Sequence, residues 1–185
     1  MATHHSSTID DLYREEGKAE LVGGEIVRMS PAADRHGKAS FLICVRLGTY
    51  LETSSLPGDG YGDGTGFLCD LPHRQSFSPD AAYYTGARGD RKFLPQAPDF
   101  AVEIRSDEDY GPKAERRLAA KRADYFAAGT RVVWDVNLDS DEVVRVYHAS
   151  DPETPTICRR GEVAEAEPAV PGWTMAVDDL FGRRD

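Results

Sequence analysis

The sequence predicts a single α/β domain in which a central mixed β-sheet carries helices on its faces. Three observations lead to this prediction: apolar residues recur at helical spacing in 34–53, a strand pattern alternates in 99–106, and residues 113–128 have a helical composition. Further strand patterns lie between these segments, and no internal repeat or linker divides the chain. A chain of 185 residues can bury roughly 70% of its unfolded surface in one core. The domain is therefore expected to span residues 1–185.

The N-terminal segment predicts a short helix followed by a hairpin. Ser7 and Thr8 can cap an acidic helix that runs through Glu16. Residues 19–22 and 25–29 are two short strand patterns separated by a Gly-Gly pair. Because glycine readily adopts the positive φ that a two-residue turn needs, these residues are expected to form a β-hairpin.

Glycine alternates strictly in residues 58–66, which is the most unusual composition in the chain. A dinucleotide-binding turn does not fit, because Asp59 and Asp63 would face the phosphates and no helix follows. A calcium loop fits poorly, because an aromatic residue falls at the third ligand position and Asp70 at the twelfth. The segment is expected to be a loop that leads into a glycine-weakened strand through about Leu68.

The second half of the chain predicts strands and one long helix in a regular order. Within the 99–106 strand, Phe100, Val102 and Ile104 lie on one face and the charged side chains on the other. The expected elements are, in order, strand 78–84, a polar loop at 86–96, strand 99–106, helix 113–128 ending before Gly129, strands 131–136 and 142–147, a loop or irregular strand at 151–170, and a helical turn at 177–181.

Composition excludes several classes of protein. With 22 Lys+Arg against 32 Asp+Glu, the net charge of −10 gives an average field that repels phosphates, so nonspecific coating of nucleic acid is not expected. A local nucleic-acid site remains possible. No apolar run approaches the roughly 20 residues that span a bilayer, and the N-terminus lacks a basic or apolar signal region. We therefore expect a cytoplasmic protein without a membrane partner.

The cysteines indicate neither a disulfide framework nor a zinc site. Cys44, Cys69 and Cys158 are odd in number and widely spaced, and none belongs to a C-x-x-C pair. They are expected to be buried apolar fillers.

Charged residues on one face of the 99–106 strand point to a chemical site. Asp99, Glu103 and Arg105 share that face, and burying such a row is costly unless the charges are paired or bind a metal. A neighbouring strand that brings Asp80 alongside Glu103 would create a carboxylate pair that needs a cation or a raised pKa. Carboxylates suit Mg²⁺ or Mn²⁺, which bind phosphate oxygens and lower the pKa of water. These residues favour phosphodiester hydrolysis.

The same residues carry a resemblance to a known family. Pro79-Asp80 followed by Glu103-Ile104-Arg105 resembles the P-D…(D/E)-x-K pattern of the PD-(D/E)XK nuclease superfamily. More specifically, the chain resembles the Uma-two (Uma2) family of putative restriction endonucleases, which implies a restriction-endonuclease-like fold. The matching stretches follow the family's order and cover nearly the whole chain: residues 20–31, His36-Gly37, Ser78-Pro79-Asp80, residues 97–104, residues 121–129 and Pro171-Gly172-Trp173.

The resemblance also implies roles for individual residues. Asp80 and Glu103 are the expected metal ligands and catalytic residues. The family supplies its lysine from the following helix, which points to Lys121 as the third catalytic residue. Lys121 flanks the apolar stripe of that helix, so its side chain can reach the site. His36, near the start of the long helix, is a candidate for substrate binding.

Two features depart from the family pattern. Arg105 occupies the lysine position of the motif, but a guanidinium stays protonated and cannot act as a general base. Arg105 is therefore expected to bind a substrate phosphate or to neutralise Asp99. Where the family runs Glu-x-x-Ser-Pro-Ser-Asp, this chain has Glu-Ile-Arg-Ser-Asp-Glu-Asp from Glu103 to Asp109, which places extra acid beside the site.

Each candidate residue also has a purely structural interpretation. Asp80 could satisfy turn amides after its proline. Glu103 could form a salt bridge to Arg105 or Lys121. Lys121 could be a charge on a solvated helix face, and His36 a satisfied structural group.

The sequence leaves open the role of two further groups of charged residues. Glu20 or Glu25 in the hairpin could supply a third carboxylate, but solubility of an edge strand would also explain both. Arg88, Arg91 and Lys92 could form a locally basic patch that attracts nucleic acid.

The leading functional hypothesis is an endonuclease that depends on Mg²⁺ or Mn²⁺ and hydrolyses DNA. Cutting two strands needs two sites, so a homodimer is expected. The acidic surface favours an alternative, in which the same fold serves as a non-catalytic binding or assembly module. A metal-dependent hydrolase of another phosphoester is a third hypothesis.

Overall fold

The computed structural model describes residues 6–89 and 92–182. The elements are α1 (Ile9–Leu12), β1 (Ala19–Val22), β2 (Glu25–Arg28), α2 (Asp34–Thr53), β3 (Asp59–Gly62), β4 (Phe67–Leu71), β5 (Arg74–Phe77), β6 (Ala81–Tyr84), β7 (Phe100–Ile104), α3 (Pro112–Ala127), β8 (Val132–Val136), β9 (Val144–His148), β10 (Asp151–Cys158), β11 (Val163–Glu165), β12 (Thr174–Ala176) and the 3-10 turn η1 (Val177–Leu180).

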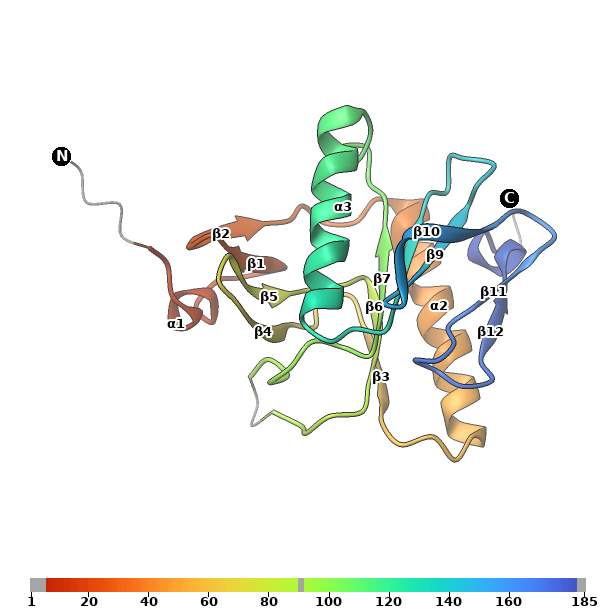
Figure 1. Cartoon of the computed structure of the whole chain (residues 1–185), viewed down its shortest axis with the longest axis horizontal. Helices are drawn as coiled ribbons and strands as arrows, with labels where there is room; N and C mark the ends of the chain where they lie inside the picture. Colours follow the sequence, from red (N-terminus) through yellow and green to blue (C-terminus); the bar gives the residue numbers. More distant parts are fainter. Residues whose placement is uncertain (1–5, 90–91, 183–185) are drawn as a thin grey trace.

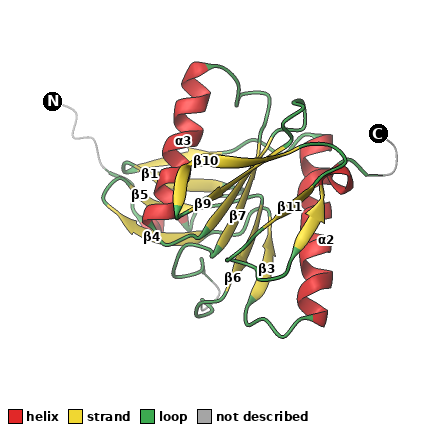
Figure 2. Cartoon of the chain, turned by 45° about the vertical axis from the view of Figure 1, so that its right-hand side comes forward, coloured by secondary structure: helices red, strands yellow, loops and turns green. Residues whose placement is uncertain are grey.

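A six-stranded sheet in the order β10-β9-β8-β7-β6-β3 forms the centre of the fold. Strands β7 and β8 are parallel and are joined by α3 as a crossover, whereas β6 and β9 run antiparallel to their neighbours in this central pair. Helices α2 and α3 lie on opposite sides of the sheet (Figure 1, Figure 2). The predicted mixed sheet flanked by helices is confirmed.

A second, four-stranded sheet in the order β2-β1-β5-β4 was not expected from the sequence. Its β1–β2 hairpin was predicted, and Gly23 and Gly24 have the positive φ values of 60° and 77° that the turn requires. Strand β5 was missed because its four residues, Arg-Gln-Ser-Phe, show no apolar alternation. Together β1 and β5 extend the molecule on the side of α3 (Figure 1).

The two faces of the central sheet pack into separate cores. Toward α2, Phe100, Val102 and Ile104 are buried in a cluster with residues of that helix. Toward α3, Ala101 is buried in a second cluster with Tyr125, which stacks on Phe77 of β5 at a ring distance of 4.0 Å. The predicted alternation along β7 is confirmed, and α3 is held between the central sheet and the second sheet.

Several boundaries differ from the expected ones. Helix α1 is only one turn long, although Thr8 caps it as predicted, in a capping box with Asp11. The region 151–170 contains β10 and β11, and the pairing of β10 shifts register between Asp151 and Thr156, where prolines interrupt it. The glycine-alternating segment contains β3, which pairs with β6.

The cysteines are free, with Cys44 and Cys69 half-buried and Cys158 buried. Over residues 6–89 and 92–182, no helix is both long and apolar enough to cross a membrane.

Candidate functional site

Strands β6 and β7 bring Asp80 and Glu103 together. Ala81 pairs with Val102 in this antiparallel ladder, so Asp80 and Glu103 are the next residues in register. The Asp80 amide donates to the Val102 carbonyl at 2.9 Å, and the Ile104 amide donates to Asp80 Oδ2 at 2.7 Å. Opposite residues of an antiparallel pair point to the same face, which here is the face of α3. The expected placement of the two acids on adjacent strands is confirmed.

Helix α3 supplies two partners for Glu103. Lys121 Nζ donates to Glu103 Oε2 at 2.8 Å, and one turn later the Tyr125 hydroxyl donates to Glu103 Oε1 at 2.6 Å. The Lys121 side chain is only 15% exposed, so the alternative of a solvated helix face is wrong. Tyr125 was not predicted as a site residue, although its i,i+4 spacing from Lys121 places both on one helix face.

Glu20 joins this group from the second sheet, and its side chain is buried. Glu20 Oε1 lies 2.8 Å from Lys121 Nζ and accepts from the Ser78 amide at 2.9 Å, while Arg74 donates to Glu20 Oε2 at 2.6 Å. Because β1 lies between β2 and β5, the edge-strand explanation is wrong for Glu20. Glu25 is exposed and is consistent with that explanation. We call Glu20, Asp80 and Glu103 the carboxylate cluster.

Cations also surround Asp80. Lys18 Nζ lies 2.6 Å from Asp80 Oδ1 and His36 Nε2 lies 3.2 Å from the same oxygen. The Ser40 hydroxyl donates to the Asp80 carbonyl at 2.7 Å. The amide that Asp80 accepts from belongs to the neighbouring strand rather than to a turn, so the turn-amide interpretation is wrong. Lys18 was not singled out in the sequence, because nothing local links it to Asp80.

The surroundings of Asp80 lower its pKa, whereas those of Glu103 raise its pKa. Burial alone would raise the pKa of Asp80, but the hydrogen bond from His36 and the charge of Lys18 outweigh it and lower the pKa to about 2. Burial raises the pKa of Glu103, and the nearby charge of Lys121 opposes this without cancelling it. Asp80 is therefore a permanent anion, whereas Glu103 takes up a proton more readily.

Lys121 remains positively charged in this setting. Burial would lower its pKa, but the charges of Glu103 and Glu20 dominate and raise it above the ordinary value. Lys121 is therefore a cation and a hydrogen-bond donor at neutral pH rather than a base.

Arg105 lies two residues beyond Glu103 but belongs to a separate group. Its guanidinium donates to both carboxylate oxygens of Asp135 at 2.7 Å and also pairs with Glu115, and its side chain is only 3% exposed. We call these three residues the arginine cluster. The expectation that Arg105 neutralises Asp99 is wrong, because Arg131 takes that role at 3.0 Å. The donors of Arg105 are directed at protein carboxylates, not at an open surface.

Charged residues of the acidic stretch and of the basic loop also form ion pairs within the protein. Asp109, in the acidic stretch after β7, accepts from the Ser106 amide and pairs with Arg117 at 2.6 Å. In the basic loop, Arg88 pairs with Asp59, and Arg91 lies outside the described residues.

The residues present can accept a divalent cation. Within the described part of the chain, no three His, Cys, Asp or Glu side chains already surround a common metal position. Mg²⁺, however, keeps several waters and needs only one or two protein carboxylates. Asp80 and Glu103 meet this requirement, and ammonium groups already contact their oxygens. The cluster therefore attracts positive charge, and Asp80 and Glu103 are the residues that would hold the ion.

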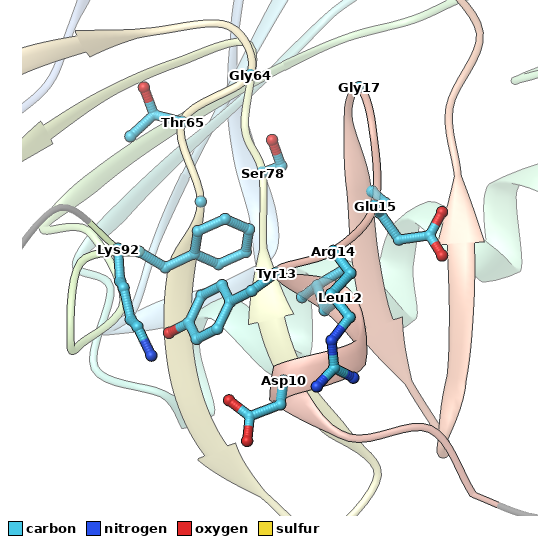
Figure 3. Close-up of a pocket in the computed structure, with 13 residues that line it drawn as sticks. Asp10, Leu12, Tyr13, Arg14, Glu15, Gly17, Gly64, Thr65, Ser78 and Lys92 are labelled. Atoms are coloured by element: carbon cyan, nitrogen blue, oxygen red, sulfur yellow. The ribbon is translucent and has the colours of Figure 1, made fainter.

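A pocket of about 680 Å³ opens on the other side of β1 (Figure 3). Gly17 and Ala19 line the pocket. Lys18, which lies between them, instead contacts Asp80, and Glu20 belongs to the carboxylate cluster and contacts Lys121. Tyr13 and Phe93, which both line the pocket, meet edge to face with a ring distance of 5.2 Å. Ser78, whose amide donates to Glu20 of the carboxylate cluster at 2.9 Å, also lines the pocket, so the pocket reaches a residue that contacts the cluster.

Comparison with known proteins agrees with this architecture. The sequence profile of the Uma2 family, described as putative restriction endonuclease, matches residues 7–178. Among solved structures, the chain is similar to a putative nuclease belonging to DUF820 from Anabaena variabilis ATCC 29413, with a TM-score of 0.71 and 16% identity over 94% of this chain and 97% of that chain. This similarity shows the fold. No curated protein matches the chain.

Proposed function

The chain belongs to the Uma2 family of putative restriction endonucleases, and on that basis we propose that it is a nuclease that uses Mg²⁺ or Mn²⁺ to hydrolyse DNA. The observation that carries the proposal is the pairing of Asp80 and Glu103 on adjacent strands with the Lys121 ammonium against Glu103. Acids with no chemical role would not be expected opposite each other in a half-buried sheet, because like charges in that arrangement are destabilising.

Each residue has a distinct part in the proposed reaction. The bound cation would neutralise phosphate charge and lower the pKa of water, which supplies the nucleophile. Asp80, an anion over the whole physiological range because of its lowered pKa, provides the fixed negative charge that holds the ion. Glu103 is the second ligand, and Tyr125 fixes its orientation through Oε1.

Lys121 supplies positive charge where the phosphate gains negative charge. Its raised pKa keeps it protonated, so we assign it charge stabilisation and orientation of the attacking water rather than proton abstraction. His36 has a raised pKa because it hydrogen-bonds to Asp80, and we propose that it adds positive charge on the substrate side. We assign Arg105 a structural role, because its guanidinium donors pair with Asp135 and Glu115.

DNA is the proposed substrate because the family is described as restriction endonucleases. A homodimer is proposed because one active site cuts one strand at a time, and light scattering of the purified protein tests it. The net charge of −10 favours the alternative of a non-catalytic binding module, since this charge opposes long-range attraction to DNA.

The test compares cleavage by the wild type with cleavage by Asp80→Asn, Glu103→Gln and Lys121→Met in the presence of Mg²⁺ or Mn²⁺. Glu25→Gln is the matched control, because Glu25 is an exposed acid of the same hairpin as Glu20. Supercoiled, linear and single-stranded DNA and RNA are the substrates. We expect the three site variants to lose cleavage and the control to keep it. Failure of the wild type to cut any of these substrates would favour the binding module.

A further inference from the structure

A fourth acid, Asp63, approaches the carboxylate cluster from the glycine-alternating segment. Lys18 Nζ lies 2.7 Å from Asp63 Oδ1 and 2.6 Å from Asp80 Oδ1, so one ammonium bridges the two carboxylates. Asp63 directly follows β3. Neither Lys18 nor Asp63 has a role in the function proposed above.

The sheet register places Asp63 in line with the two proposed ligands. Gly62 pairs with Ala81, and Ala81 pairs with Val102. Asp63 directly follows β3, Asp80 directly precedes β6 and Glu103 lies on β7, so the three acids form a row across the same end of these neighbouring strands.

The glycine alternation shows which way the side chains of β3 point. A Cβ at Gly60 would lie 3.5 Å from the Leu47 side chain, and one at Gly62 would lie 3.6 Å from Cys44 Sγ. Both glycines therefore face α2. Because side chains alternate along a strand, Tyr61 turns to the opposite face, where it packs beside the core under α3. The contact with Lys18 places Asp63, the next residue but one, near the carboxylate cluster.

Three acids in one row repel one another unless a cation lies between them. Lys18 provides that cation. Its pKa is raised, since the charges of Asp80 and Glu103 outweigh the effect of burial. The N–O distances of 2.6 and 2.7 Å are those of an ammonium, whereas Mg²⁺ holds its oxygens at about 2.0–2.1 Å. The acids are thus spaced for lysine and would draw closer around a metal ion.

We propose that Asp63 is a third carboxylate of the divalent-cation site and that Lys18 is a built-in counter-cation that the incoming metal displaces. This inference rests on the function proposed above, because it takes Asp80 as a metal ligand. Before the metal binds, Lys18 holds Asp63 and Asp80 together. When the metal binds, the ammonium leaves both oxygens and moves toward solvent, which its 17% exposed side chain already reaches.

Calorimetric titration of the full chain with MnCl₂ tests the proposal without measuring cleavage. We expect Asp63→Asn to weaken Mn²⁺ binding by at least about tenfold, as loss of a supporting ligand does elsewhere. Asp59→Asn is the matched control, because Asp59 lies in the same segment but pairs with Arg88 on the surface. We expect its affinity to stay within about twofold of wild type, since no metal ligand changes.

The Lys18→Met variant distinguishes a lysine that the metal ion displaces from a lysine that only stabilises the fold. Removing the competitor should tighten Mn²⁺ binding about tenfold, whereas a purely structural lysine would leave affinity unchanged or lower it. If Lys18→Met does not fold without metal, a rise in its unfolding temperature with Mn²⁺ that exceeds the wild-type rise supports the same conclusion. The matched control is Lys38→Met, because Lys38 lies over the Phe41 ring on the outer side of α2.

The outcomes distinguish this inference from the proposed function. If an Asp80→Asn, Glu103→Gln double variant binds Mn²⁺ as the wild type does, the proposed function fails, and this inference fails with it. If that double variant loses binding while Asp63→Asn matches Asp59→Asn and Lys18→Met matches Lys38→Met, only the inference about Asp63 and Lys18 is overturned.

Discussion

The carboxylate cluster and the arginine cluster are neighbours on β7 but differ in their cations. Glu103 and Asp135 are paired in register on β7 and β8, yet Glu103 contacts Lys121 whereas Asp135 contacts Arg105. A guanidinium engages both oxygens of a carboxylate in a fixed planar fork, while an ammonium is a point charge on a flexible stem. The pair of Arg105 and Asp135 is therefore held in one geometry, whereas lysine contacts rearrange more easily, as the proposed displacement of Lys18 by a metal ion requires.

This difference predicts that substitutions in the two clusters affect different properties of the protein. Variants of the carboxylate cluster should lose activity and keep their stability, whereas variants of the arginine cluster should lose stability first. The following predictions test the contrast, beginning with the largest expected effect.

Glu103→Gln should lower the rate of metal-dependent DNA cleavage by at least about 10³-fold, since a ligand that holds the reacting ion is lost. Its free energy of unfolding should change by less than about 1 kcal/mol, because Lys121 stays paired with Glu20. Cleavage assays and urea unfolding measure the two effects. A variant that cuts normally, or one that unfolds, would contradict the proposed role.

Arg105→Met should lower the free energy of unfolding by about 3–5 kcal/mol, since it leaves the buried Asp135 carboxylate without its partner. An Arg105→Met, Asp135→Leu double variant should recover much of the loss, because the buried carboxylate is removed together with its partner and the Glu115 side chain is half-exposed to solvent. Urea denaturation checks both. Equal losses in the single and double variants would show that the pair itself is not the cause.

Mn²⁺ should raise the unfolding temperature of the wild type by several degrees, because at a hundredfold excess over Kd the ion stabilises the folded state by about 2.7 kcal/mol. The Asp80→Asn, Glu103→Gln double variant should show no such rise, while Glu25→Gln should match the wild type. Differential scanning calorimetry with and without Mn²⁺ measures the shift. An equal rise in the double variant would place the metal elsewhere.

Tyr125→Phe should reduce cleavage by about tenfold, since Glu103 loses the hydrogen bond that orients it. The phenyl ring should keep its stacking on Phe77, so the free energy of unfolding should fall by no more than about 1.5 kcal/mol. Steady-state cleavage and urea unfolding, measured on the same sample, separate these effects. A large loss of stability with unchanged activity would reverse the assignment.

Asp109→Asn should have the smallest effect, about 1 kcal/mol in the free energy of unfolding at pH 7. Burial would raise the pKa of Asp109, but hydrogen bonds from Ser106 and the charge of Arg117 outweigh it and lower the pKa below its ordinary value of 3.8. A lowered folded-state pKa contributes stability above the unfolded-state pKa and loses it as the pH falls through the folded-state value. The difference between variant and wild type should therefore be full at pH 7 and begin to shrink below about pH 4, so it should be smaller at pH 3 than at pH 7 in urea unfolding.

The sequence was most informative where one element carries its own pattern. The alternation along β7 predicted the two faces of that strand, and the family motifs led to Asp80, Glu103 and Lys121, which the fold brings together. The short hairpin turn was readable from its Gly-Gly pair.

Contacts between sheets were not predictable in the same way. Lys18 and Arg74 reach the cluster only because the second sheet packs beside the first, and neither β1 nor β5 is long enough to show which face it buries. Glu20 was a candidate third carboxylate, but the sequence could not choose between it and Glu25. The partner of Arg105 depends on the parallel register of β7 and β8, which two residues far apart in sequence do not reveal. For this reason the sequence pointed to Asp99, on the same strand face as Arg105, and Asp135 was not identified.

The crossover helix α3 has a consequence for how the protein is made. Strands β3, β6 and β7, with Asp63, Asp80 and Glu103 at their ends, are all synthesised before α3. While α3 is still inside the ribosome, the nascent chain carries the acids without Lys121 or Tyr125, and β8 cannot yet pair with β7. The proposed site is therefore complete only after the crossover helix has left the ribosome, because Lys121 and Tyr125 are the last of its residues to be synthesised.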